Sequence, residues 1–352
     1  MHGRGLTLKV SPNNIALDQG EFGGILMQAI VYTQYGPPDV LQLKEVEKPT
    51  PNDSQVLVRV HAVSLNPAEA HMRKGALMAR VIGGTGLLKP KNTILGADFS
   101  GRVEAVGSNV TQFKRGDEVF GRRVPGGFAE YVCVSENPIV LKPANITFEQ
   151  AAAVPVAAIT ALQSLRDAGQ IQPGQKVLVN GASGGVGTFT VQIAKSFGAD
   201  VTGVCSTRNL DLVRSIGAER VIDYTREDFT RNGQRYDLII DNVGNRSVSD
   251  YARALSPEGI CVIAGYSSMV LVLQYMLLGG LISRTGSKKI GTMLAHVKKQ
   301  DLLVLNELME AGKVVSVIDK TYPLSEVSEA YRHLETRRAR GKIVVTWEQD
   351  NK

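Results

Sequence analysis

The alternation of apolar and polar positions changes character near Pro143. Residues 27 to about 142 alternate short β-branched runs with turn residues, as in "QVLVRVHAVSL" and "FAEYVCV", a pattern typical of β-strands. The segment "TFEQAAAVPVAAITALQSLRDAG" that follows has the alanine-rich spacing of helices, and Thr147 with Gln150 resembles a capping box at a helix start. We therefore predict a β-rich first part followed by helices.

Strand candidates then recur with helical segments between them. They lie at residues 200–205, 220–223, 236–241 and 259–264. This rhythm is that of a parallel sheet with crossover helices, so we predict a doubly wound α/β domain. The last segment adds the helix "KQDLLVLNELMEAG", the strand "VVSVIDKTYPL", a helix from Ser325 and the strand "GKIVVTW", and it could extend either domain.

Composition and charge agree with two globular domains. A chain of 352 residues predicts two domains at about 150 residues each. The net charge is +6, but the basic residues are scattered, and the densest run, residues 337–342, has no aromatic interleaving. We interpret that run as a solvated helix end rather than a nucleic-acid stripe, although a phosphorylated small molecule would also suit it. Three widely spaced cysteines predict no disulfide framework, which fits a reducing, cytoplasmic location.

Two segments stand apart from these domains. Residues 1–26 carry little periodicity and too short an apolar run for a signal peptide, so we interpret them as an extension. Residues 269–282, "MVLVLQYMLLGGLI", are strongly apolar, but 14 residues are too few to cross a bilayer. A pocket wall, a lid, a subunit contact or a peripheral membrane contact are the roles open to this segment.

The stretch "GASGGVG", Gly181 to Gly187, directly follows an apolar strand and opens a helix. In this context glycines let the chain reverse and let backbone N–H groups approach a pyrophosphate, which the helix N-terminus attracts. The alternative is a tight turn with no ligand. The residues that we predict to bind a dinucleotide here are Ser183, Gly184, Gly185, Val186 and Gly187.

The end of the second strand indicates which dinucleotide is bound. A carboxylate commonly stands there and would repel a 2′-phosphate, but this chain has Ser206 and Arg208, while Asp200 lies at the other end of the strand. An arginine can meet a phosphate with two parallel hydrogen bonds. We therefore predict NADP(H) as cofactor, with a solvated surface arginine as the alternative for Arg208.

Two further strand ends should border the same crevice, because ligands of open α/β sheets lie beyond the carboxyl ends of the strands. The turns at these strand ends place Asn242, Val243 and Gly265 near the ribose and nicotinamide of the bound dinucleotide. Tyr224, which closes "RVIDY", could reach the adenosine end, and a buried structural tyrosine is the alternative.

The β-rich first half together with "AAAVPVAAITA", "GASGGVG", "GAERVIDY" and "GKIVV" resembles the medium-chain dehydrogenase/reductase superfamily, from about Met27 to Trp347. The resemblance implies a GroES-like catalytic domain, residues 27–150 completed by 301–352, and a Rossmann domain, residues 151–300. It also implies an active site between them and a homodimer formed through the edge of the Rossmann sheet. Residues 288–292 are the candidate edge strand.

Zinc-containing members of that superfamily carry a cysteine in the first catalytic loop and a Gly-His-Glu segment after it. Here the loop reads "SLNPAE" and the later segment "GADFSG", which offer no thiol or imidazole to a zinc ion, so we predict no metal. The chain thus resembles the zinc-independent, zeta-crystallin-like quinone oxidoreductase branch, whose members reduce quinones or α,β-unsaturated carbonyl compounds with NADPH. The alternatives are a non-catalytic NADPH-sensing or RNA-binding protein and a zinc-free alcohol or aldehyde dehydrogenase-like reductase.

The same resemblance suggests two catalytic residues. Asn66 matches the asparagine that the branch places near the nicotinamide, where it would orient substrate or stabilise an oxyanion; Asn-Pro is also a plain turn signal. His71 stands where some quinone reductases have a tyrosine, and it would deliver a proton, unless it is a surface or packing residue. Glu69 and Asp98 are either a carboxylate pair or, as we favour, structural acceptors for loop amides.

Overall fold

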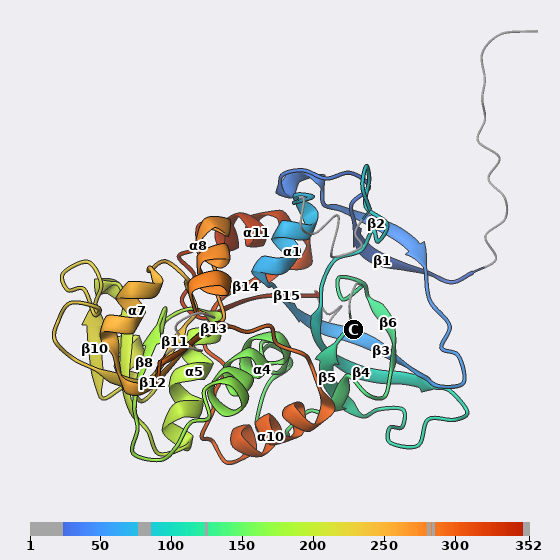
Figure 1. Ribbon diagram of the computed structural model, residues 1–352. Coiled ribbons are helices and arrows are strands. Elements are labelled where there is room, and N and C mark those ends of the chain that lie inside the picture. The colour runs from blue at the N-terminus through green and yellow to red at the C-terminus, as the bar shows by residue number, and fades with distance from the viewer. Residues whose placement is uncertain (1–23, 77–85, 124–125, 280–282, 284–285, 348–352) are drawn as a thin grey trace, which may run out of the picture.

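The computed structural model describes residues 24–76, 86–123, 126–279, 283 and 286–347, so most of the predicted extension 1–26 lies outside the described residues. Two units lie side by side, each built around its own sheet (Figure 1). The expected fold class, a β-rich domain with a doubly wound parallel-sheet domain, is confirmed.

The first unit contains a seven-stranded sheet of order β14-β15-β3-β4-β5-β7, with β6 also pairing with β3. Its strands are β3 (Gln55–Ser64), β4 (Asp98–Val106), β5 (Glu118–Arg122), β6 (Tyr131–Ser135), β7 (Ile139–Leu141), β14 (Ile318–Pro323) and β15 (Lys342–Thr346). A separate pair, β1 (Leu26–Val31) and β2 (Gln42–Glu47), packs on the same core. Short helical segments complete the unit: η1 (Pro38–Val40), α1 (Pro67–Arg73), η5 (Leu324–Glu326) and α11 (Val327–Glu335).

The two last strands complete a sheet that begins almost 300 residues earlier. β15 pairs with β3 in the antiparallel sense, Val344 opposite Ser64, and runs parallel to β14. The Leu65 N–H donates to the carbonyl of Ile343 at 3.0 Å. This pairing brings the start of β15 beside the loop that follows β3, as Figure 1 shows for the red strand among blue and green ones.

The second unit is a six-stranded, fully parallel sheet of order β10-β9-β8-β11-β12-β13. Its strands are β8 (Lys176–Asn180), β9 (Asp200–Cys205), β10 (Arg220–Asp223), β11 (Tyr236–Asp241), β12 (Leu255–Ile263) and β13 (Lys289–Thr292). The chain runs outward from β8 to β10 and then returns to the other side of β8 as β11. The carboxyl ends of β8 and β11 therefore form the switch point at which such sheets bind ligands.

Helices cover both faces of this sheet, which explains why its central strands are continuous apolar runs. Val177 of β8 belongs to one core and Leu178 to the other, and both are fully buried. The Thr147–Gln150 capping box forms as predicted and opens α3. α3 (Phe148–Ala152) packs on β3 and β4 of the first unit. The helical segments that follow it are α4 (Pro155–Gln163), η2 (Ser164–Ala168), α5 (Gly185–Ser196), η3 (Thr207–Asn209), α6 (Leu210–Ser215), α7 (Val248–Ala254), α8 (Met269–Gln274), η4 (Tyr275–Gly279) and α10 (Lys299–Glu310).

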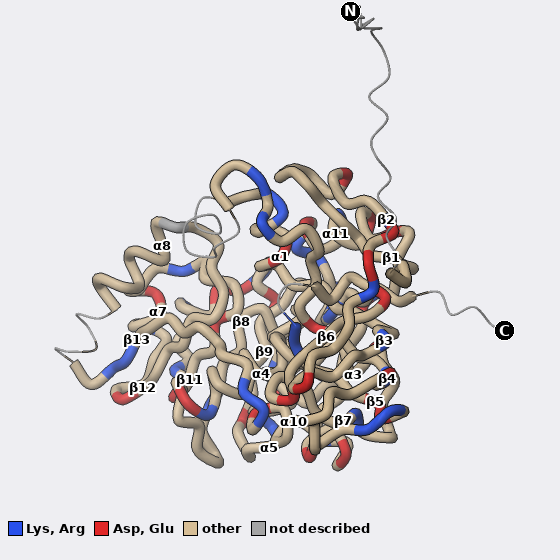
Figure 2. The backbone as a smooth tube through the Cα atoms, turned by 90° about the vertical axis from the view of Figure 1, so that its right-hand side faces the viewer, with Lys and Arg blue, Asp and Glu red and all other residues tan. Residues whose placement is uncertain are grey.

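The apolar segment predicted at 269–282 is helical over its described part, α8 and η4, and residues 280–282 lie outside the described residues. Leu271 and Tyr275 pack toward the core, whereas Val270, Leu273 and Leu277 are 75%, 57% and 72% exposed. None of the helices that the structure describes is both long and apolar enough to span a membrane. Basic and acidic residues are interspersed along the chain (Figure 2).

Candidate functional site

The glycine-rich turn folds as a tight reversal between β8 and α5. Gly181 adopts a positive φ of 76°, a conformation that favours glycine. A Cβ on Gly187 would lie 2.0 Å from the carbonyl oxygen of Gly181, so the first turn of α5 packs directly on the strand end. The helix N-terminus consequently faces the switch point of the sheet, where its N–H groups can bind an anion.

Ser183 and Ser206 lie side by side, although they follow different strands. The buried Asn209 joins them, because its amide donates to the Ser183 hydroxyl at 2.9 Å and to the Ser206 hydroxyl at 3.3 Å. Sequence reasoning missed Asn209, since an asparagine after a strand indicates a turn and not its partners. The structure therefore brings together two of the residues predicted to bind the dinucleotide.

Arg208 lies at the same end of the sheet, in η3, with its side chain exposed. Its guanidinium donates to the carbonyl of Arg338, in the segment between α11 and β15. That segment also contacts the glycine turn, because the Gly341 N–H donates to the carbonyl of Ser183 at 2.9 Å. Among the described residues, no carboxylate lies within ion-pair distance of Arg208, Arg337, Arg338 or Arg340. The four arginines thus supply positive charge beside the turn.

Tyr224 stands next to this region, after β10. Its backbone N–H donates to the carbonyl of Cys205 at 3.1 Å, and its side chain is 56% exposed. The alternative of a buried structural tyrosine is therefore wrong. Its contact with an adenosine stays a prediction.

The turns after β11 and β12 are packed against each other and leave one amide unused. The side-chain nitrogen and oxygen of Asn242 are both buried, and neither has a hydrogen-bond partner among the described residues. The Asp241 carboxylate fixes the same turn by accepting the N–H groups of Val243 and Gly244, each at 2.7 Å. A Cβ on Gly265 would lie 2.1 Å from the Asn242 carbonyl, so the two turns can touch only with glycine there. A buried amide without partners is costly, which fits a group that bonds to a ligand.

Replacing Asn242 by Leu separates ligand binding from folding. Because the buried amide bonds to nothing in the described protein, its removal relieves a desolvation cost, and we expect the free energy of unfolding of the ligand-free protein to stay the same or to rise by about 1 kcal/mol. Cofactor affinity should fall about tenfold, through loss of about one hydrogen bond. Denaturant unfolding and fluorescence titration measure the two quantities.

The matched control is Asn180→Leu, one strand away. The Asn180 amide donates to Asp241 at 3.0 Å and to Asn245 at 3.2 Å, so this variant should lose about 1–3 kcal/mol of stability. Equal destabilisation of both variants would show that the Asn242 amide is a structural group.

Asn66 caps α1, and its side chain is almost fully buried. Its amide nitrogen donates to Asp98 at 3.0 Å and to Glu69 at 3.4 Å, and its oxygen accepts from the Lys342 ammonium at 2.7 Å. Asn66 therefore both begins a helix, as the Asn-Pro turn signal indicated, and holds its side-chain amide in a fixed orientation. Since both amide N–H groups are used, this geometry favours a positioning role; the direct contact of Asn66 with substrate stays a prediction.

Glu69 and Asp98 lie within this arrangement as buried carboxyl groups. Burial raises the pKa of Glu69 to about 7 and also raises the pKa of Asp98, while the Lys342 charge opposes both shifts. As favoured from the sequence, they accept backbone N–H groups: Glu69 from Asn66 at 3.4 Å and Asp98 from Val156 at 3.1 Å. They also form the carboxylate pair considered as the alternative.

Lys342 and Tyr331 are the residues of this region that sequence reasoning missed. Tyr331 donates to Glu69 at 3.0 Å, and burial lowers the pKa of Lys342. Lys342 stands in the motif "GKIVV", but only the pairing of β15 with β3 shows where it lies. No signal in the sequence indicated Tyr331.

His71 lies in the last turn of α1 and faces the second unit. Its ring stacks on that of Tyr266, which follows β12, with ring centroids 6.2 Å apart. Burial lowers the pKa of His71, and the charges of Lys74 and Arg337 lower it further, so the imidazole is neutral at pH 7. This position between the units is compatible with both proton delivery and packing, and the catalytic role stays a prediction.

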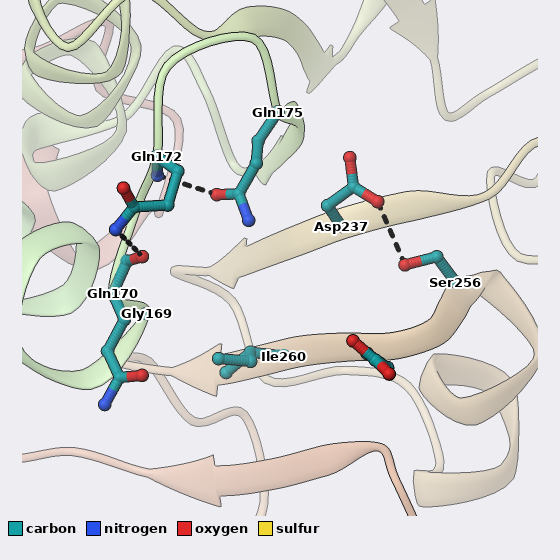
Figure 3. A pocket seen from close by; sticks show the side chains of 8 residues that line it. Gly169, Gln170, Gln172, Gln175, Asp237, Ser256 and Ile260 are labelled. Atoms are coloured by element: carbon teal, nitrogen blue, oxygen red, sulfur yellow. Dashed lines mark hydrogen bonds between the residues drawn. The ribbon is translucent and has the colours of Figure 1, made fainter.

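A hollow of about 330 Å³ opens at the opposite end of the parallel sheet (Figure 3). Gln172 and Gln175 line it beside the start of β8, and Asp237 and Ser256 bond to each other at 3.0 Å near the starts of β11 and β12. Because ligands of such sheets bind at the carboxyl ends, this hollow is not the crevice that the glycine turn faces.

The donors for a zinc site do not converge. Among the described residues, no three His, Cys, Asp or Glu side chains gather around a point that could hold a metal ion. The two segments in which zinc-containing members have ligands supply an amide, Asn66, and two carboxyl groups, Glu69 and Asp98, each already bonded to protein.

Comparisons with known proteins identify the family. A model described as "Alcohol dehydrogenase GroES-like domain" matches residues 52–144, and one described as "Zinc-binding dehydrogenase" matches residues 216–345. The chain is 37% identical over 333 residues to the "NADPH-dependent alkenal/one oxidoreductase, chloroplastic" of Arabidopsis thaliana, covering 91% of this chain and 79% of that protein. The chain belongs to the medium-chain dehydrogenase/reductase superfamily.

Within that superfamily the similarity is to the quinone and enone oxidoreductase branch. The "2-methylene-furan-3-one reductase" of Solanum lycopersicum is 36% identical, covering 91% of this chain and 79% of that protein. Among solved structures, the quinone oxidoreductase from Coxiella burnetii superposes with a TM-score of 0.80 at 33% identity, covering 92% of this chain and 99% of that one. The family expected from the motifs is confirmed.

Proposed function

We propose that this protein is an NADPH-dependent oxidoreductase that reduces quinones or α,β-unsaturated carbonyl compounds by hydride transfer. One observation carries the proposal. At the carboxyl ends of β8, β9 and β11 the chain offers a helix N-terminus, an arginine and a buried amide; within the described part of the chain the arginine has no carboxylate partner and the amide has no hydrogen-bond partner. The alkenal/one and furanone reductases and the quinone oxidoreductase named above support the substrate class.

Each predicted residue then has a task. The turn Ser183–Gly187 faces the diphosphate, Ser206 and Arg208 bind the 2′-phosphate, and Tyr224 borders the adenosine. Asn242, Val243 and Gly265 hold the ribose and nicotinamide. When bound, the nicotinamide supplies the hydride, and the protein supplies position and electrostatics.

We propose that the reaction needs no zinc. A quinone or enone accepts hydride at carbon and spreads the negative charge onto oxygen, so a few hydrogen-bond donors can stabilise the product. The bonded amide of Asn66 and carboxyl group of Asp98 support this proposal, because a zinc site needs about three free N, S or O ligands in one place.

Steady-state turnover tests the function. We expect oxidation of NADPH by quinones and enones, with turnover of saturated aldehydes and alcohols at least about 100-fold lower, because an isolated carbonyl is hard to polarise without a Lewis acid. Elemental analysis of the same preparation should find zinc well below one per chain, and a chelator should leave the rate unchanged.

Two results would contradict the proposal. Preference for alcohols with stoichiometric zinc would favour a zinc dehydrogenase. Failure to turn over any acceptor despite tight NADPH binding would favour the sensing protein considered from the sequence. An RNA-binding role would require affinity that survives added salt, since nonspecific charge attraction does not.

We also propose a homodimer formed through β13. This strand ends the parallel sheet among the described elements, and the exposed apolar residues Val270, Leu273 and Leu277 lie on the helical segment that packs against it. Pairing of two β13 strands would cover that face, and sedimentation equilibrium should give twice the chain mass.

The three free thiols support a reducing location such as the cytoplasm. The Arabidopsis relative is named as chloroplastic, and cell fractionation distinguishes the two locations.

A further inference from the structure

Five side chains from four distant segments meet in one buried polar cluster between the glycine turn and the first catalytic loop. None of them is more than 4% exposed. Lys342, at the start of β15, lies against the turn, because a Cβ on Gly185 would meet its side chain at 3.0 Å. The members of the buried polar cluster are Asn66, Glu69, Asp98, Tyr331 and Lys342.

The Lys342 ammonium sets the orientation of the Asn66 amide. It donates to the Asn66 side-chain oxygen at 2.7 Å and to the Leu65 carbonyl at 2.9 Å. With the oxygen held there, the amide nitrogen must point toward Asp98 and Glu69, to which it donates. An ammonium has no acceptor capacity, so it permits only this orientation.

The cluster holds two carboxyl groups but one ammonium. With both carboxyls ionised it would carry a net negative charge away from water, which is costly. Two further cations lie near the cluster. Arg122 of β5 stands opposite Asp98 and its charge lowers the pKa of Asp98, but less than burial raises it, and it makes no hydrogen bond with Asp98 among the described residues. Arg73, behind the Tyr331 ring, is paired with Glu335.

The hydrogen bonds indicate that Glu69 and Asp98 together retain one proton. Both oxygens of Glu69 accept hydrogen bonds, from Asn66 and Tyr331, which favours its ionised form. One Asp98 oxygen is buried without a partner in the described structure, which disfavours ionisation there. The raised pKa values of both groups, with burial as the main cause, agree with a proton retained near pH 7. Such a pair titrates as a unit.

We propose that Lys342 is a positioning residue that fixes the Asn66 amide, and that Glu69 and Asp98 share one proton so that the cluster is neutral during turnover. The inference rests on the proposed function. Loss of the shared proton at higher pH adds a negative charge beside the catalytic loop. Because negative charge also develops on the substrate oxygen, kcat should fall as pH rises through the titration of the pair.

The first test replaces Lys342 by Met, with the exposed Lys313→Met as matched control. At saturating NADPH and an enone acceptor, K342M should lower kcat about 100-fold, as a misplaced site group does, and K313M should stay within twofold. The dissociation constant of NADPH, from nicotinamide fluorescence, should change far less than kcat. An equal rise in that constant would make Lys342 a coenzyme ligand and overturn the positioning role.

The second test is the pH profile of the single variants Glu69→Gln and Asp98→Asn. Each replaces one titrating group by a neutral amide and leaves one carboxylate for Lys342. Each should lower the plateau of kcat by up to about tenfold and move its alkaline decline upward by at least one pH unit. The double variant leaves a buried ammonium unpaired and should lose activity about 100-fold. Singles that keep the wild-type profile, or a wild-type rate independent of pH, would overturn the shared proton.

A measurement without turnover separates this inference from the proposed function. A carboxyl group whose pKa is raised in the folded state has its charged form disfavoured by folding, so stability falls as pH rises from its unfolded value toward about 7. The urea midpoint of the wild type should therefore drop more between pH 4.5 and 8 than that of E69Q. If no acceptor is reduced but this difference appears, the function is wrong and the shared proton stands; parallel midpoints overturn the shared proton.

Discussion

Replacing Arg208 by Asp is expected to raise the KM for NADPH about 100-fold while leaving that for NADH within about threefold. A guanidinium bound to a phosphate contributes about 1.5–3 kcal/mol through charge-assisted hydrogen bonds, and a carboxylate in its place adds repulsion. NADH lacks the 2′-phosphate, so the substitution neither removes a hydrogen bond from NADH nor adds repulsion to its binding. Initial rates with each coenzyme at a saturating acceptor measure the ratio.

The control for this change is Arg231→Asp, which alters the net charge equally. Arg231 is exposed on the loop before β11, at the amino ends of the strands. It should leave both coenzymes unaffected. An equal rise in the KM for NADPH and for NADH in R208D would show that Arg208 does not contact the 2′-phosphate. A neighbouring arginine, such as Arg338, would then be the candidate ligand of that phosphate.

The Gly187→Ala substitution is expected to lower the free energy of unfolding by about 3 kcal/mol or more. The added Cβ would lie 2.0 Å from the Gly181 carbonyl oxygen, and this contact is with backbone, so α5 must move off the end of β8. Overpacking of this kind typically costs about 1–3 kcal/mol and exceeds that when backbone must shift. The displaced helix N-terminus should also weaken coenzyme binding. Urea unfolding without ligand and NADPH titration give the two effects.

Gly291→Ala supplies the comparison within the same sheet. A Cβ at Gly291 would have no atom within 4 Å among the described residues, so the change should stay within about 1 kcal/mol. A stable G187A variant with unchanged NADPH affinity would mean that the turn relaxes without cost.

Local patterns were sufficient to predict most of the parallel sheet. The expected strands at 200–205, 220–223 and 236–241 coincide with β9, β10 and β11, because short β-branched runs between turn residues have few other structures open to them. The expected strand at 259–264 is longer, since β12 begins at Leu255. Leu255 belongs to the strand because it pairs with Tyr236 of β11, ahead of a shift in register after which Ile260 pairs with Leu238.

The candidate site was predictable only where it is local in sequence. The glycine turn is one continuous segment, and its motif carries the geometry. Lys342 bonds to Asn66 across 276 residues and Tyr331 to Glu69 across 262, and no local pattern encodes such contacts. The unused amide of Asn242 is likewise a property of its surroundings, so the sequence indicated its place but not that it lacks partners.

The closing of the first sheet by β15 has a consequence for biosynthesis. The six parallel strands are contiguous in sequence and can assemble as soon as Thr292 has left the ribosome. The last residues of β3, by contrast, must wait for β15, some 280 residues downstream. Domains generally fold as units during synthesis, and pairing of remote strands is slow. The nucleotide-binding half should therefore become protease-resistant first in stalled nascent chains, and Lys342 would reach Asn66 only in the final step of maturation.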